Sequence, residues 1–180
     1  MRANFRRRRG RLHGQSGTTM IELMMAGFIM VVGFLGLMVL ITAAIATNNR
    51  NKMDTNATLA AQMVYEEVRS SIVTGSPLTV TDCAGNTWTI GLGSTTVGAT
   101  AGAPLSGATI DYSAAIVSSY QMDYNVCTAS GRRATYDVRW NIKTLTDGVS
   151  HITVGSRPKG ASSDLKFFAL PVTLRGIAGS

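Results

Sequence analysis

The sequence has little charge, few aromatic residues and almost no histidine or cysteine. Of its 180 residues, 15% are charged and 7% are aromatic, and there are two histidines and two cysteines. Both fractions are low for a soluble domain. The second half lacks HExxH, GxSxG and P-loop motifs; Asp111, Asp123 and Asp137 are scattered, and His151 is expected on the surface. We therefore expect neither an enzyme nor a bound cofactor or metal.

Acidic residues are missing from the N-terminus, and this places the net charge of +7 there. Six of the 17 basic residues precede Gly17, so residues 18–180 carry 11 basic and 10 acidic residues. The excess charge therefore lies in a short tail and not on a polyanion-binding surface. The second half does contain a basic set and tyrosines of the kinds that bind nucleic acid: Arg132, Arg133, Arg139, Lys143, Arg157, Lys159 and Lys166, with Tyr112, Tyr120, Tyr124 and Tyr136. Ordinary surface charges and core tyrosines explain these residues more simply, so nucleic acid is unsupported as a partner.

Charge is absent between Leu23 and Asn49, and from Leu23 to Ala46 nearly every residue is apolar or small. At about 1.5 Å per residue, such a helix is longer than the roughly 30 Å hydrocarbon core of a bilayer. Arginines precede the run, and only Arg50 and Lys52 follow it closely. This asymmetry favours a cytoplasmic N-terminus, with residues 50–180 on the outer face of the membrane.

Two ordinary explanations for this segment are a cleaved secretory signal and a plain signal anchor. Ala44-Ile45-Ala46 has the form of a signal peptidase site, but the apolar stretch is far longer than the usual 7–15 residues of a signal peptide. A plain anchor does not explain Glu22. Inserting a carboxylate at the N-terminal end of an apolar helix into the bilayer costs on the order of 2–3 kcal/mol of free energy, unless the group is paired or at the interface.

A short motif surrounds this glutamate: Gly17-Thr18-Thr19-Met20-Ile21-Glu22 follows the arginine-rich leader and precedes the apolar run. The motif resembles the class III signal of type IV pilins and pseudopilins. In that family a prepilin peptidase cuts after the glycine, the new N-terminus is N-methylated, and a glutamate occupies the fifth mature position. The resemblance implies cleavage after Gly17, N-methylation of Thr18, and pairing of Glu22 with the terminal amine of a neighbouring subunit during assembly.

The segment departs from the family pattern at two places. The usual first mature residue is Phe and here it is Thr18, and Val39 stands where major pilins carry a proline. The apolar run instead contains Gly27, Gly33 and Gly36, and its GFLGL stretch is similar to minor pilins of the PilV type. Glycines of this kind allow close helix approach.

The resemblance implies a structural minor subunit of a type IV pilus, active in pilus initiation or the tip complex, in motility, adhesion or DNA uptake. Its implied partners are prepilin peptidase, other major and minor pilins, the inner membrane and the inner-membrane assembly platform. The protein would be a single-pass inner-membrane protein before assembly, and then part of the pilus, the cell surface or the periplasm. A pseudopilin of a type II secretion system is the first alternative. A signal-anchored extracytoplasmic binding domain that does not polymerise is the second.

A second helical pattern follows the apolar run. Apolar or small residues recur at steps of three and four: Met53, Ala57, Ala60, Met63, Val64, Val68 and Ile72. This period predicts an amphipathic helix that ends at Thr74-Gly75-Ser76-Pro77. Together the two patterns predict one helix of about 55 residues, Thr18 to Ile72. Four segments follow: a leader over 1–17, a transmembrane and polymerisation half over 18–47, an amphipathic half over 48–75, and a β-rich extracytoplasmic head over 76–180.

The remainder of the chain predicts a small antiparallel sheet. Alternating apolar and polar residues make Arg133–Thr144 the clearest strand, with one face to bury. Strands are also predicted at Ser150–Val154 and Lys166–Leu174, the latter at an edge because it contains Pro171. Gly91–Gly107 predicts a loop. The fold class is therefore α+β and pilin-like, with the long N-terminal helix packed on an antiparallel sheet of three or four strands.

Cys83 and Cys127 are the only cysteines, and both fall in the segment placed outside the cytoplasm. An even cysteine count in such a compartment favours a disulfide, and the absence of CxxC argues against a catalytic or metal-binding pair. Closing the loop over residues 83–127 would stabilise the head by about 3–4 kcal/mol in the chain-entropy model.

Overall fold

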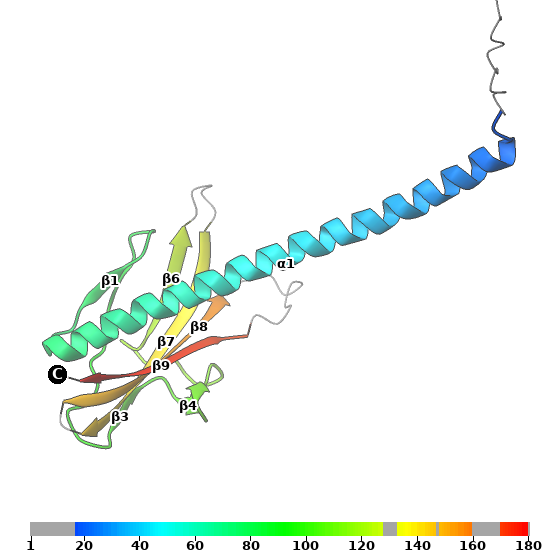
Figure 1. Ribbon diagram of the computed structural model, residues 1–180. Coiled ribbons are helices and arrows are strands. Elements are labelled where there is room, and N and C mark those ends of the chain that lie inside the picture. Colours follow the sequence, from blue (N-terminus) through cyan, green and yellow to red (C-terminus); the bar gives the residue numbers. More distant parts are fainter. Residues whose placement is uncertain (1–16, 128–132, 147, 160–169, 180) are drawn as a thin grey trace, which may run out of the picture. The chain divides into compact units, whose positions relative to one another are not determined.

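The computed structural model describes residues 17–127, 133–146, 148–159 and 170–179. The chain divides into two compact units, 1–46 and 47–180. One helix, α1 (Met20–Thr74), contributes its first half to the first unit and its second half to the second (Figure 1). The strands that follow belong to the second unit, so the expected α+β fold is confirmed.

Helix α1 is uninterrupted over 55 residues. It contains no proline, and apolar and helix-favouring residues fill most of its length. The helix ends where Gly75 adopts a left-handed backbone (φ 66°), with its N–H donating to the Ile72 carbonyl at 3.3 Å. This is the glycine-terminated end that the sequence predicts.

The main sheet of the second unit is antiparallel and has five strands in the described residues. Strands β3, β7, β8 and β9 lie side by side in that order, and β6 pairs with the N-terminal part of β7. The strands are β3 (Thr100–Gly102), β6 (Gln121–Cys127), β7 (Arg133–Thr146), β8 (Val149–Lys159) and β9 (Val172–Gly179). The long β7–β8 hairpin lies at the centre of the sheet, because β3 and β6 pair with β7 on one side and β9 pairs with β8 on the other.

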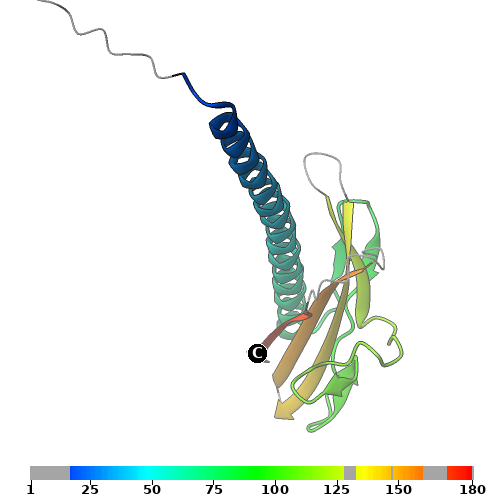
Figure 2. The same cartoon turned by 90° about the vertical axis from the view of Figure 1, so that its right-hand side faces the viewer.

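The second half of α1 packs on one face of this sheet, and the hydrophobic core lies between them (Figure 2). The alternating residues of β7 point into this core as predicted, and Tyr136, Val138, Trp140 and Ile142 are fully buried. The helix contributes small side chains, which allow close approach to the sheet: Ala57, Ala60, Ala61, Val64 and Val68. The Tyr136 hydroxyl also donates to the Met53 carbonyl at 3.4 Å.

The opposite face of the sheet is also covered, which the sequence did not predict. Asp137, Arg139 and Asn141 of β7 are all nearly inaccessible, at 3%, 5% and 3% exposure. The covering segment is residues 103–114, which follows β3 and lies on the side of the sheet away from α1 (Figure 2). Gly155 of β8 permits this contact, because a Cβ there would lie 2.8 Å from both Ile110 Cγ1 and the Tyr112 hydroxyl.

Several predicted boundaries need correction. The segment Gly91–Gly107 is not all loop, because it contains β3 and β4 (Leu105–Ser106), and β4 pairs with β5 (Thr109–Ile110). A further hairpin joins β1 (Thr79–Thr81) to β2 (Thr87–Thr89). These additions exceed the three or four strands predicted, because such short strands carry too few residues to show a period.

The last strand also begins later than predicted. β9 starts at Val172, one residue after Pro171, and runs to Gly179. Among the described strands it pairs only with β8, so it is an edge strand, as predicted, although Pro171 itself precedes the strand. Residues 166–169 of the predicted strand lie outside the described residues, as does Asp147 between β7 and β8. Gly148, which directly precedes β8, adopts a left-handed backbone (φ 72°).

Candidate functional site at the N-terminal helix

The residues of the candidate motif lie just before α1 and in its first turn. Gly17, Thr18 and Thr19 precede the helix and are exposed. Thr19 caps it: the Glu22 N–H lies 3.0 Å from the Thr19 carbonyl oxygen and 3.4 Å from Thr19 Oγ1. Ser or Thr followed three residues later by Glu is the sequence pattern of a capping box. The motif therefore encodes a helix start, with Thr18 outside the helix and Glu22 within its first turn.

The position of Glu22 suits a carboxylate. The unpaired N–H groups of the first helical turn give this end a partial positive charge, which favours a negative side chain. Glu22 is exposed and is the acidic residue of the first turn. No ion pair of Glu22 is seen among the described residues. The carboxylate of Glu22 is thus favoured by the helix N-terminus and is accessible to a partner.

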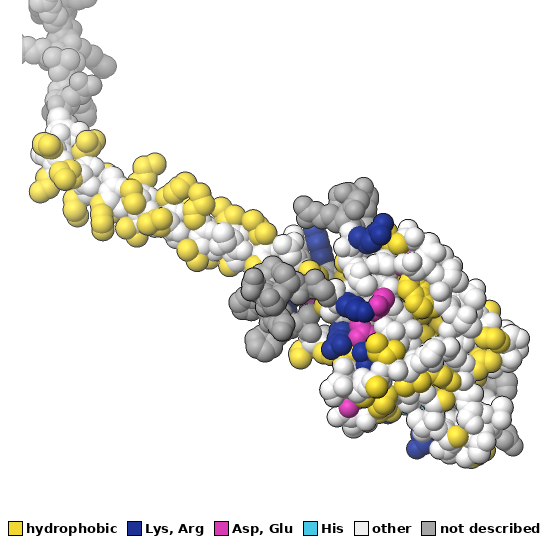
Figure 3. Space-filling view, turned by 180° about the vertical axis from the view of Figure 1, so that it is seen from behind, with side chains coloured by type: hydrophobic (Ala, Val, Ile, Leu, Met, Phe, Trp, Pro, Cys, Tyr) yellow, Lys and Arg dark blue, Asp and Glu magenta, His cyan; other side chains and the backbone are white. Residues whose placement is uncertain are grey.

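The first half of α1 presents a continuous apolar surface. All of its side chains from Met20 to Ala46 are exposed, including Phe28 at 69% and Val39 at 67% (Figure 3). By length and composition, α1 can cross a membrane. A surface this large and apolar needs lipid or protein to cover it. The structure thus agrees with the coarse expectation of a membrane-compatible N-terminal helix.

The three glycines of this half, Gly27, Gly33 and Gly36, have open space around them in the part of the chain that the structure describes. A Cβ at Gly27, Gly33 or Gly36 would meet nothing within 4 Å. Each glycine also lowers helix stability by roughly 0.5–1 kcal/mol relative to alanine. No contact among the described residues therefore accounts for glycine at these positions.

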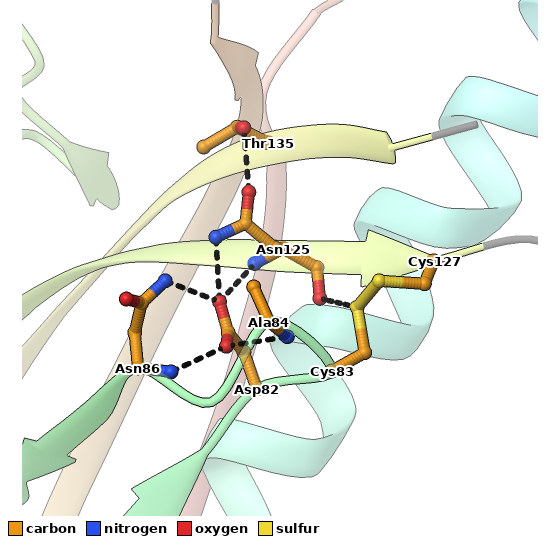
Figure 4. The surroundings of a disulfide bond; sticks show 7 residues. All are labelled: Asp82, Cys83, Ala84, Asn86, Asn125, Cys127 and Thr135. Atoms are coloured by element: carbon orange, nitrogen blue, oxygen red, sulfur yellow. Dashed lines mark hydrogen bonds between the residues drawn. A yellow bond between two sulfur atoms is a disulfide. The ribbon is translucent and has the colours of Figure 1, made fainter. Parts of the chain in front are cut away.

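The predicted disulfide is confirmed in the second unit. Cys83, in the turn between β1 and β2, is bonded to Cys127 at the end of β6, with their Cα atoms 5.9 Å apart (Figure 4). The disulfide borders a hollow of about 410 Å³ beside Leu59 and Met63 of α1. The bond therefore ties the small β1–β2 hairpin to the main sheet near the helix.

Three residues of the basic set proposed for nucleic acid, Arg139, Arg157 and Lys159, pair with acidic side chains. Both Arg139 and Arg157 donate to the buried Asp137 carboxylate, with N–O distances of 3.0 Å. Their guanidinium groups lie 5.1 and 4.3 Å from the centre of the Tyr112 ring. Burial and the Asp137 charge raise the pKa of this tyrosine well above its usual value. Lys and Arg side chains accordingly lie beside acidic ones on this face (Figure 3).

The structure describes several of the remaining candidate residues. Lys159 pairs with Asp123, and Arg132 and Lys166 lie outside the described residues. His151 is half-buried in β8; burial and then the charges of Arg175 and Lys143 lower its pKa. In the part of the chain that the structure describes, no three His, Cys, Asp or Glu side chains are grouped as metal ligands.

Sequence patterns missed the buried polar residues of the second unit. Asp82 is 6% exposed and accepts hydrogen bonds from several N–H groups near the disulfide. The turn sequence Asp82-Cys83-Ala84-Gly85-Asn86 predicts such local bonding, since aspartate and glycine favour tight turns. Nothing in the sequence predicts that the same carboxylate also reaches β6.

Comparison with known proteins gives no relative from which a role can be transferred. No protein-family model matches the sequence, no curated protein matches it, and no solved structure matches the fold. A functional assignment therefore depends on the N-terminal motif, the exposed apolar helix and the α+β layout.

Proposed function

We propose that this protein is a minor subunit of a type IV pilus, made as a prepilin and assembled through α1. The observation that carries the proposal is the motif Gly17–Glu22 at the start of a helix whose next 24 residues, Leu23–Ala46, are apolar or small and exposed. The α+β layout of helix and sheet is consistent with a pilin-like fold. Each feature alone is common; their order along one chain supports the proposal.

The geometry at Gly17 suits proteolytic processing. The bond between Gly17 and Thr18 lies outside the helix and is exposed. The residue that caps the helix, Thr19, lies on the C-terminal side of this bond. Removal of residues 1–17 by prepilin peptidase would therefore leave the cap and the first turn of α1 in place. Thr18 would become the new N-terminus and the site of N-methylation.

Glu22 would act in assembly. After cleavage, the new amine at Thr18 of one subunit and the carboxylate at Glu22 of another carry opposite charges. In a low-dielectric helical bundle these charges attract strongly, and leaving either one unpaired is costly. The pair therefore selects the register of neighbouring helices. Gly27, Gly33 and Gly36 would allow those helices to approach closely.

The proposal specifies a location and a set of partners. The arginine-rich leader would hold the N-terminus in the cytoplasm while α1 spans the inner membrane. The second unit would lie outside the cytoplasm, where its disulfide can form. Other major and minor pilins and the inner-membrane assembly platform would then receive the processed subunit.

The mature N-terminus tests this proposal directly. The full chain is produced with a prepilin peptidase, and its N-terminal peptide is identified by mass spectrometry. We expect a mature chain that begins at Thr18 with an N-methyl group. Gly17→Leu should remain uncut, because a large side chain replaces glycine at the scissile bond, whereas the matched control Gly27→Leu should be cut normally.

Other products would contradict the proposal in distinct ways. A mature chain beginning at Thr47 would indicate ordinary signal peptidase acting after Ala44-Ile45-Ala46. An uncut wild-type chain would indicate an anchored extracytoplasmic domain that never enters a filament. Cleavage of Gly17→Leu at the wild-type rate would show that the motif is not what the peptidase recognises.

A further inference from the structure

Asp82 organises the turn between β1 and β2. Its Oδ1 accepts hydrogen bonds from the backbone N–H groups of Ala84 at 2.9 Å and Asn86 at 2.8 Å. The Asn86 side-chain amide donates to the other oxygen, Oδ2, at 3.1 Å. A carboxylate that accepts from the residue two positions ahead fixes a tight turn. The turn that contains Cys83 is therefore held by its own aspartate.

The same carboxylate also binds the main sheet. Oδ2 accepts from the Asn125 backbone N–H at 3.2 Å and from its side-chain Nδ2 at 2.5 Å. The Asn125 Oδ1 in turn accepts from the Thr135 hydroxyl of β7 at 2.8 Å. Figure 4 shows this chain of contacts running from the turn through β6 to β7. Because β6 pairs only with β7 among the described strands, Asp82 satisfies a backbone donor on its outer edge.

These contacts join the two segments that carry the cysteines. Cys83 directly follows Asp82, and Cys127 lies two residues after Asn125 on β6. The Asn125 carbonyl oxygen lies 3.0 Å from Cys83 Sγ, so a reduced Cys83 can donate its S–H to it. The carboxylate and the disulfide thus connect the same turn to the same strand.

We propose that Asp82 is a positioning residue that brings Cys83 and Cys127 together for oxidation. Bonds from Asp82 to Asn125 restrain the turn against β6 while the thiols are still separate. Restraint of two reacting groups raises their effective concentration, because the entropy of bringing them together has been lost beforehand. The disulfide and the hydrogen bonds therefore support each other, and each favours formation of the other.

The oxidation uses a small disulfide such as oxidised glutathione. The thiolate of one cysteine attacks a glutathione sulfur, which breaks the glutathione S–S bond and releases one glutathione thiolate. The second protein thiolate then attacks the protein sulfur of this mixed disulfide and releases the other glutathione. Two electrons pass to the two glutathiones, which take up the two protons that the cysteines lose.

The hydrogen bonds also favour the charged form of Asp82. Burial raises the pKa of this carboxyl, but donation from Asn125, Asn86 and Ala84 outweighs burial and lowers the pKa to about 2. The carboxylate is therefore ionised at the neutral pH at which thiols oxidise. Hydrogen bonds to a charged acceptor are roughly twice as strong as neutral ones, so an amide cannot substitute fully.

The test is the effective concentration of the two thiols in full-length protein purified in detergent. The protein is equilibrated with mixtures of reduced and oxidised glutathione, alkylated, and analysed by mass spectrometry. We expect Asp82→Asn to lower the effective concentration about tenfold or more. Asp111→Asn is the matched control: Asp111 accepts from the N–H and hydroxyl of Ser113 in a similar turn, away from the cysteines.

A merely structural role for Asp82 would give a different pattern. The free energy of unfolding is measured for Asp82→Asn with the disulfide intact and in the Cys83→Ser/Cys127→Ser background. A positioning role makes the substitution more costly when the disulfide is present, whereas a structural role costs the same in both. An effective concentration within twofold of wild type would overturn the proposal. If Asp82→Asn does not fold, Asn125→Ala, which retains the Asp82 turn, must lower the effective concentration or the proposal fails.

Discussion

The two halves of α1 have the same backbone and opposite surroundings. From Met20 to Ala46 every side chain is exposed, and Val39 is 67% exposed. In the second half Val64 and Val68 are completely buried against the sheet. A helix that is apolar all round requires lipid or other helices, whereas one with a single apolar stripe is satisfied by its own sheet. Folding therefore buries the apolar stripe of the second half, whereas the apolar surface of the first half needs lipid or other helices to cover it.

The largest expected effect tests whether the first half of α1 packs against other subunits through Glu22. If the protein assembles as proposed, Glu22→Ala should lower its incorporation into filaments about a hundredfold, because the partner amine would be left unpaired in a low-dielectric bundle. The measurement is the amount of the subunit in sheared filaments, relative to the amount in the membrane. Glu66→Ala, on the exposed face of the second half, is the control and should assemble normally. Normal incorporation of Glu22→Ala would contradict the assembly role while leaving processing at Gly17 intact.

A smaller effect is expected when the two halves are compared by how much a valine in each contributes to the free energy of unfolding. Val64→Ala should lower the free energy of unfolding of the second unit by about 2 kcal/mol, because it leaves a cavity between α1 and the sheet. Val39→Ala should change it by less than about 0.5 kcal/mol, since this side chain contacts no core. Urea unfolding in detergent, followed by tryptophan fluorescence, measures both, because Trp140 is in the core. Equal losses in the two variants would mean that the halves do not differ as described.

The sequence predicted the elements that have long, regular patterns. The apolar run and the steps of three and four predicted α1 to within two residues at each end. The alternation of apolar and polar residues in β7 correctly identified its core-facing side chains. These patterns are readable because one periodic face meets one environment over many residues.

The sequence could not predict contacts between distant segments. The alternation in β7 suggested a solvated second face, because Asp137, Arg139 and Asn141 are polar. Those side chains are buried because residues 103–114 cover them and because Asp137 pairs with two arginines. Likewise, the bond from Asp82 to Asn125 joins residues 43 positions apart and carries no local signal. Long-range polar pairing depends on topology, which a single sequence does not display.

The smallest expected effect concerns two glycines, one in each unit. Gly176 of β9 packs against Tyr65 of α1, and a Cβ there would overlap the tyrosine ring. Gly176→Ala should therefore cost about 1 kcal/mol of unfolding free energy, since the end of the tyrosine side chain can shift. In Gly33→Ala the new Cβ meets nothing within 4 Å among the described residues, so this variant should leave the stability of the second unit unchanged. If close helix packing is what requires Gly33, the alanine variant will instead show reduced incorporation into filaments, and normal incorporation would show that this glycine is only tolerated.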